Sequence, residues 1–362
     1  MSAAPAATER PDGPDLARPP AATGRGSLLA AELGRLRRRR LVLTLVGLAL
    51  VALVVGMAVV FATHSTDFAG ARAKAATQAQ AQAEGQREAE AQCRQDPSVP
   101  EAERAEACDF GDAPAAEDLY VDPRFFAETG LPVVVVAVGV AGALVAALVG
   151  ATAVGADWSS RAILTLLTWE PRRLRLLGTR LLAIALGTAA LGLLAQALAL
   201  GLGALTVQLR GSWGAPPVPV GIEGDGGSAF LPHAHFWRDL LSLQLRGVVL
   251  MVLAALLAAS VTSITRHTGG LLGLMFAWFA VAENAVRALA GDRGWSRWLI
   301  TENILAFLMP GGQRLPAGTR ITAEGLEPRT VLVSNLDALL YLGLLTAAAA
   351  LLAGVLLRRR DL

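Results

Sequence analysis

Uninterrupted apolar runs place the strongest constraint on this chain. Several of them exceed 18 residues, the length at which an apolar stretch is read as a membrane-spanning helix. Hydrophobic residues make up 54% of the sequence and charged residues only 17%, whereas a soluble domain of this length would carry more charge. The sequence therefore predicts an integral membrane protein of the all-α class.

Six membrane spans are expected, and polar segments separate them. We place the spans at residues 41–63, 131–155, 180–205, 243–265, 269–290 and 335–357. The first 27 residues are rich in Ala, Pro and Gly and lack apolar periodicity, which is typical of disorder. The predicted organisation is a disordered cytoplasmic tail 1–27, a surface helix with the first span 28–63, an extracytoplasmic insertion 64–130, and a five-span core 131–362.

The distribution of arginine predicts the orientation in the membrane. Residues 28–40 end in an Arg run, and their leucines fall near one face of a helix, which fits a short helix on the membrane surface. A simple Arg-rich stop before the first span would give the same pattern. Six spans place both termini on one side, and the densest Arg clusters abut spans one, three and six on that side. The positive-inside rule then predicts that both termini are cytoplasmic.

The insertion 64–130 is acidic and contains the only two cysteines of the chain. Residues 67–92 are rich in Ala and Gln and contain no Pro, so they are expected to form a helix. In the predicted topology the insertion faces an oxidising compartment, where a disulfide between Cys93 and Cys108 is plausible. Two free thiols remain the alternative.

Residues 156–176 interrupt the apolar pattern between the second and third spans. Their first part has an apolar face, and their second part is basic and begins at Pro171, a residue suited to the first turn of a helix. An amphipathic segment of this kind can lie along the membrane or dock into a groove of a cytoplasmic partner. Alternatively, Arg172 and Arg173 serve only to fix the topology.

This segment, GADWSSRAILTLLTWEPRRLRLLGTRLL, resembles the signature region of the permeases of type-2 ABC exporters. The acidic position of that pattern is occupied by Asp157, although Glu is commoner there. The other matching positions are Leu166, Leu167, Thr168, Pro171, Arg172, Arg173, Gly178 and Arg180. The six spans, the helix before the first span and the Arg-Arg-Asp sequence near the end of the chain agree with the resemblance, which covers about residues 28–362.

The resemblance implies a permease of the bacterial plasma membrane that works by alternating access, paired with a second copy or a relative. It also implies a separate ATPase subunit that grips the segment between spans two and three. The residues that we assign to this coupling are Asp157, Arg161, Leu166, Leu167, Trp169, Pro171, Arg172 and Arg173. Lys74 is the only lysine, and its neighbours do not form a P-loop, so ATP would bind to the partner.

Glu283 and Arg287 are four residues apart within the fifth predicted span. An ionisable residue inside a span indicates function by default, and a contact in the translocation path is one interpretation. A structural ion pair near the outer interface is the other. We expect no enzyme active site, no cofactor or metal in this chain, and no nucleic-acid partner.

The size of the insertion 64–130 motivates an alternative from another class. In this alternative the chain is a membrane scaffold or sensor that transports nothing, and its insertion binds a partner. An ion-coupled carrier would need buried carboxylates and an internal repeat, and no convincing repeat is visible. Association with an ATPase distinguishes the transporter from the scaffold.

Overall fold

The computed structural model describes residues 25–101, 103–160, 172–214, 235–290, 294–322 and 325–359. Within these residues, six helical segments are long and apolar enough to cross a membrane. They are α2 (Arg40–Thr63), α5 (Ala127–Ser159), α7 (Arg173–Arg210), α8 (Phe236–Thr265), the segment from α9 (Thr268–Phe276) through α10 (Glu283–Ala290), and α12 (Asn335–Arg359). The chain is therefore a multi-pass helical membrane protein, as the apolar runs predict.

Two of the helices extend well beyond their predicted spans. Helix α7 has 38 residues, which at ~1.5 Å per residue makes it ~57 Å long, against a hydrocarbon core of ~30 Å. Helix α5 has 33 residues. Hydropathy marks the part of a helix that lies in lipid, whereas the helix itself continues into the polar surroundings. The ends of α5 and α7 therefore enter the segment 156–176 from both sides.

The fifth span is not one regular helix. Between α9 and α10 the chain forms the π-helical turn η2 (Ala277–Ala282). Such turns insert an extra residue into a helix and are frequent at functional sites. Glu283 is the first residue after this turn.

Helices α5 and α8 make the most extensive helix–helix contact in the described structure. Small residues at every fourth position of α5 are all buried, and they are Gly139, Ala143, Ala147, Ala151 and Gly155. A Cβ atom added at Gly139 would lie 3.2 Å from the Cα atom of Gly247 in α8. Small residues on one ridge allow helices in lipid to approach closely, and this ridge serves that purpose.

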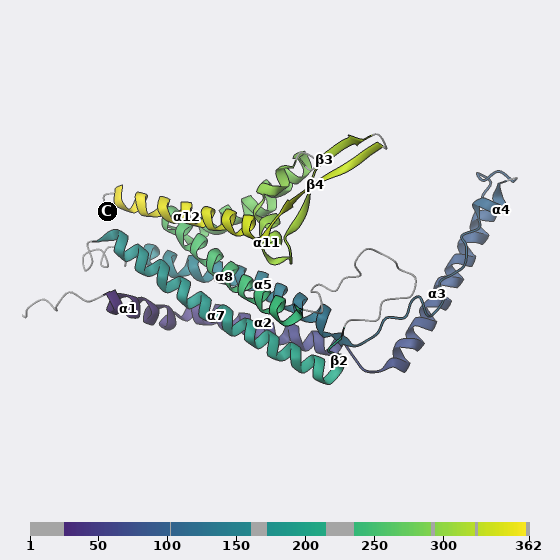
Figure 1. The fold of residues 1–362 in the computed structure, drawn as a ribbon, viewed down its shortest axis with the longest axis horizontal. Helices are drawn as coiled ribbons and strands as arrows, with labels where there is room; N and C mark the ends of the chain where they lie inside the picture. Colours follow the sequence, from purple (N-terminus) through teal and green to yellow (C-terminus); the bar gives the residue numbers. More distant parts are fainter. Residues whose placement is uncertain are drawn as a thin grey trace, which may run out of the picture.

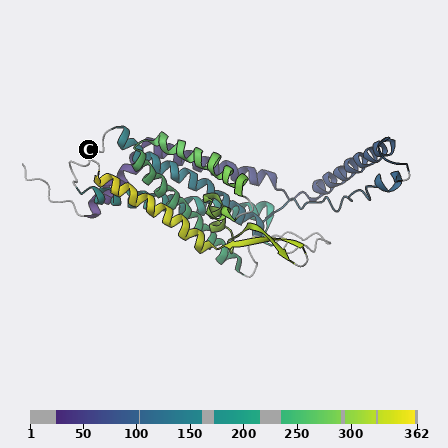
Figure 2. The same ribbon diagram turned by 90° about the horizontal axis from the view of Figure 1, so that it is seen from above.

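The helices form an elongated bundle with two different ends (Figure 1). We call one the basal end, which carries α1 (Arg25–Arg38), the last turn of α5, the first turn of α7 and the last turn of α12. The other is the distal end. Both ends of the described chain lie at the basal end in both views (Figures 1 and 2). Helix α1 occupies part of the predicted surface helix and packs against α7.

The insertion 64–130 projects from the distal end (Figure 1). Its main element is α3 (Phe68–Gln95), which is followed by the short helix α4 (Arg104–Ala107), and a disulfide joins Cys93 to Cys108. The insertion returns to the bundle through strand β1 (Phe125–Phe126), which pairs in parallel with β2 (Gly211–Ser212) at the end of α7.

The region between the fifth and sixth spans differs from the all-α prediction. After the 3₁₀ turn η3 (Trp295–Trp298) and helix α11 (Ile300–Leu308), strands β3 (Gln313–Thr322) and β4 (Gly325–Val333) form an antiparallel hairpin. The sequence pattern did not identify this hairpin, because its strands do not alternate strictly between apolar and polar residues. The β-branched residues Thr330, Val331 and Val333 are the local signal that favours a strand.

Replacing both cysteines, Cys93→Ser with Cys108→Ser, should loosen the tip of the insertion and leave the bundle intact. A disulfide that closes a loop of this length contributes roughly 3 kcal/mol in the chain-entropy model. Helix α3 packs chiefly on α4, so we expect faster amide exchange around residues 90–108 without a change in the melting temperature of the bundle. A lower melting temperature of the bundle would contradict this independence.

Candidate functional site

A buried carboxylate joins three helices at the basal end. Asp157, in the last turn of α5, is 5% exposed. It accepts a hydrogen bond of 2.5 Å from Nη2 of Arg39, which precedes α2, and it forms an ion pair with Arg180 of α7. We call Arg39, Asp157 and Arg180 the basal ion cluster.

The same two guanidinium groups also bind the backbone of α5. Nη1 of Arg39 donates to the carbonyl oxygens of Thr152 (3.1 Å) and Ala153 (2.7 Å), and Nη2 of Arg180 donates to that of Ala153 (3.1 Å). Cations near a helix C-terminus interact favourably with its partial negative charge. Arg39 and Arg180 thus hold the end of α5 both through the Asp157 side chain and through backbone carbonyl groups of the helix.

A second ion pair lies beside the cluster. Glu32 of α1 is 6% exposed and lies 3.2 Å from Arg35. Burial and the nearby charge of Arg35 lower the pKa of the Arg39 guanidinium, while Glu32 acts in the opposite direction. An arginine remains charged at neutral pH after such a shift, so three guanidinium groups face two carboxylates in this region.

The structure changes the role assigned to Asp157. Its carboxylate points into the bundle and is occupied by Arg39 and Arg180, so it is not available as a contact for a partner. Five other predicted coupling residues lie outside the described residues, and they are Arg161, Leu166, Leu167, Trp169 and Pro171. Asp157 instead fixes the position of the last turn of α5, which leads into the segment 156–176.

The two arginines at the start of α7 have different environments. Arg172 is exposed. Nη1 of Arg173 donates to the carbonyl oxygen of Leu357 (3.1 Å), which connects α7 to the last turn of α12. Of this pair, Arg172 is therefore the better candidate for contact with a partner.

Another buried carboxylate lies in the fifth span. Glu283 is 1% exposed. It accepts hydrogen bonds from the backbone N–H groups of Ile300 (2.9 Å) and Thr301 (3.2 Å), from the Thr301 hydroxyl (2.5 Å) and from Nε1 of Trp278 (3.2 Å). The first N–H groups of a helix have no partner within the helix. Glu283 supplies that partner to α11 and attaches it to the fifth span.

Arg287 contributes to the same network mainly through other residues. Its Nη2 lies 3.9 Å from Glu283 but 3.0 Å from Oε1 of Glu302, and it also donates to the Thr301 hydroxyl at 2.5 Å. The predicted pair of Glu283 and Arg287 is thus a weak part of a larger contact. This arrangement favours the structural interpretation over a role in the translocation path.

Sequence reasoning identified Arg287 as a partner of Glu283 but missed the other partners of both carboxylates. Arg180 was part of the family pattern, but its position two turns inside a long apolar helix was a signal that it needed a buried counter-ion. Gln196 and Gln244, which are also buried in the core, were missed as well. Nε2 of Gln196 donates to the Val135 carbonyl oxygen (3.2 Å), and Nε2 of Gln244 donates to the carbonyl oxygen of Gln196 (3.3 Å).

Comparison with known proteins does not place the chain in a family. No family model matches it, and neither a curated protein nor a solved structure shows significant similarity. Among the described residues, no cluster of His, Cys, Asp or Glu has the composition of a metal site. Both arginines of the basal ion cluster are paired with Asp157. The cluster therefore serves to hold helices together.

Proposed function

We propose that this chain is the membrane subunit of an ATP-binding-cassette exporter. A separate cytoplasmic ATPase would act on the segment 156–176, and a second copy or a relative would complete the permease in the bacterial plasma membrane. The basal end is then cytoplasmic, and the insertion and the β3–β4 hairpin lie on the outer side. The resemblance of residues 155–182 to the permease signature supports this assignment.

The observation that carries the proposal is the basal ion cluster. Helices α5 and α7 continue directly into the two ends of the segment 156–176, and Asp157 ties both helices to Arg39. A displacement applied to this segment is therefore passed to α1, α2, α5 and α7 together. Transport by alternating access needs such a connection between an external motor and the spans, because packed helices move as rigid bodies.

Isolation of the full chain from its native membranes tests the proposal. We expect an affinity-tagged chain in mild detergent to bring down a protein with a P-loop, identified by mass spectrometry, together with ATP hydrolysis. Reconstitution of both proteins should raise the ATPase turnover. A chain that is isolated intact, with neither a P-loop protein nor ATP hydrolysis, would refute the transporter assignment.

The charge reversal Arg172→Glu should weaken contact with the ATPase. Arg172 is exposed at the start of α7, and reversing a charge at a protein interface produces like-charge repulsion. We expect roughly a tenfold loss of co-isolated ATPase, the factor that ~1.4 kcal/mol produces. Quantitative mass spectrometry measures it, with Arg314→Glu on the exposed hairpin as the matched control.

Reversal of both arginines, Arg172→Glu with Arg173→Glu, should go further and uncouple ATP hydrolysis from export, although the chain still inserts. Because Arg173 also binds Leu357, the single variant Arg172→Glu separates the partner contact from the contact with α12. Normal export by the double variant would argue that these arginines serve topology alone.

The scaffold alternative retains one supporting observation. Helix α3 has 28 residues and projects away from the bundle (Figure 1), which leaves it accessible to another protein. A scaffold should associate with its partner through this insertion. In that case deletion of residues 68–121 would abolish the association with this partner. The deletion would not change the amount of ATPase that is recovered with the protein.

A further inference from the structure

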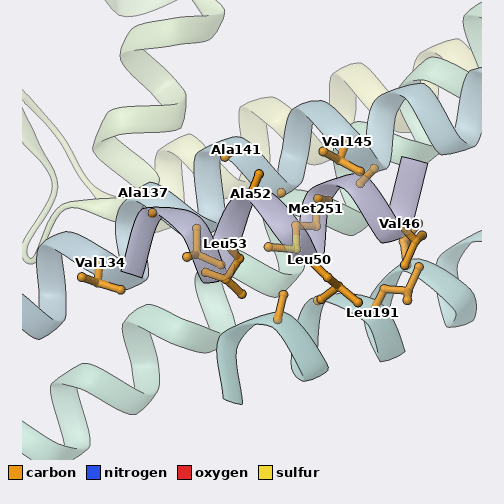
Figure 3. A pocket seen from close by; sticks show the side chains of 18 of the residues that line it. Val46, Leu50, Ala52, Leu53, Val134, Ala137, Ala141, Val145, Leu191 and Met251 are labelled. Atoms are coloured by element: carbon orange, nitrogen blue, oxygen red, sulfur yellow. The ribbon is translucent and has the colours of Figure 1, made fainter. Parts of the chain in front are cut away.

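An apolar cavity of about 380 Å³ lies between α2 and the rest of the bundle. Residues of α2, α5 and α7 and Met251 of α8 line it (Figure 3). Among the described residues that line it, Thr188 is the one with a polar side chain, and its hydroxyl donates to the Ile184 carbonyl oxygen at 2.8 Å. A cavity with no polar group left to satisfy does not favour water and suits an apolar ligand.

Small residues opposite α2 create this space. Helix α2 presents Leu50 and Leu53 to the cavity, whereas α5 presents Ala137 and Ala141 and α7 presents Gly192. These side chains are too short to meet those of α2 over the whole contact. The opposite face of α2 packs on nothing within the described chain, and its side chains Val51, Val55 and Val59 are exposed.

The cavity is long. Its lining on α2 runs from Val46 to Val60, which is ~21 Å at ~1.5 Å per residue. This exceeds half of the ~30 Å hydrocarbon core of a bilayer. A ligand that fills such a space within a membrane is an extended alkyl chain, of which bilayer lipid is the constant source.

A separate, small polar recess of about 10 Å³ lies on the basal side of the cavity. It is lined by Arg35 and Arg39 and by Ala153 and Ile184. Ala153 is one helical turn from Val149, and Ile184 is one turn from Thr188, where the apolar cavity ends on α5 and α7. The apolar and the polar space therefore follow one another along the same two helices.

The recess carries an excess of positive charge. Its guanidinium groups are those of Arg35, Arg39 and Arg180, and the carboxylates that pair with them are those of Glu32 and Asp157. The neighbouring residues Arg37, Arg38 and Arg40 are exposed and add to this excess. Basic pockets between membrane helices attract anionic lipid headgroups.

We propose that this end of the bundle binds one anionic phospholipid. An acyl chain lies in the apolar cavity, and the phosphate headgroup lies at the exposed residues Arg37, Arg38 and Arg40 beside the recess, which is itself too small to hold it. The proposal does not depend on the transporter assignment, because it uses only the membrane location, the cavity and the charges. Bound lipid would fill the gap behind α2 and hold that helix against α5 and α7.

Native mass spectrometry of the full chain with defined lipids tests the site. The protein is released from nanodiscs of equal parts phosphatidylglycerol and phosphatidylcholine with identical chains. We expect retention of one phosphatidylglycerol molecule, with roughly tenfold preference over phosphatidylcholine, as one additional charge interaction near the headgroup supplies. Equal retention of both lipids would overturn the proposal.

Two alanines of α2 provide a matched pair of variants. Ala52 lines the cavity, whereas Ala58 is exposed and does not line it. We expect Ala52→Phe to reduce retained lipid roughly tenfold, because the ring occupies the space of several methylene groups, and Ala58→Phe to retain it. Equal lipid retention by the two variants would show that the acyl chain does not bind in the cavity. Should Ala52→Phe fail to fold, Ala141→Phe fills the cavity from α5, with lipid-facing Leu144→Phe as its control.

Charge variants test the headgroup separately. The double variant Arg38→Gln with Arg40→Gln removes the exposed charges that flank Arg39 and leaves the basal ion cluster intact. We expect it to abolish the preference for phosphatidylglycerol without abolishing lipid retention. The control Arg314→Gln with Arg320→Gln removes two exposed charges from the hairpin and should keep the preference. A preference that survives in both would contradict the headgroup assignment.

Discussion

Replacing Asp157 with alanine is expected to lower the free energy of unfolding by about 3–5 kcal/mol, the cost of breaking a buried ion pair from one side. Removal of the carboxylate leaves Arg180, which is 5% exposed, without its counter-ion. Arg39 loses the same partner but is less buried. Unfolding of the detergent-solubilised chain, followed by circular dichroism, measures the effect, and the basal ends of α5 and α7 should show the largest gain in amide exchange.

Two further variants identify the cause of this loss. Asp112→Ala removes a carboxylate from an exposed position of the insertion, and we expect a change within about 0.5 kcal/mol. The double variant Asp157→Ala with Arg180→Ala should be less destabilised than the sum of its single variants, because it removes the unpaired cation as well. Additive losses would show that the two side chains do not form the pair described above.

Replacing Glu283 with alanine should lower the free energy of unfolding by about 3 kcal/mol, because several partly buried donors lose their acceptor at ~1–3 kcal/mol each, without full additivity. The affected donors are the N–H groups of Ile300 and Thr301 and the indole of Trp278. Helix α11 loses its N-terminal partner, so its amides should exchange faster. Hydrogen exchange resolved by mass spectrometry over residues 300–308 measures this.

The isosteric variant Glu283→Gln separates hydrogen bonding from charge. Gln keeps one carbonyl acceptor, and we expect it to cost about 1 kcal/mol, the value of a typical hydrogen bond. Glu88→Ala, at an exposed position of α3, is the control for loss of an acidic residue. Unchanged exchange in α11 with Glu283→Ala would disprove the capping role and would restore a function in the translocation path as the better interpretation.

The apolar runs predicted the membrane-spanning helices because burial in lipid imposes a length and a composition that are visible locally. The start of α7 near Pro171 and the helical character of the insertion followed from local preferences in the same way. The hairpin at 313–333 did not, since its strands satisfy each other's backbone groups by pairing. Strand pairing of this kind leaves only a weak signal in composition.

The sequence by itself determined the number of spans, the helices before and after the first span, and the presence of an ionisable pair, Glu283 and Arg287, inside the fifth span. Only the tertiary structure decided that Asp157 is buried against Arg39, 118 residues away, and that Glu283 caps a helix that begins 17 residues later. Hydropathy and helical periodicity act over a few turns, so they predict elements. Which groups pair with a buried charge depends on how the helices pack side by side. No local pattern in the sequence encodes that packing.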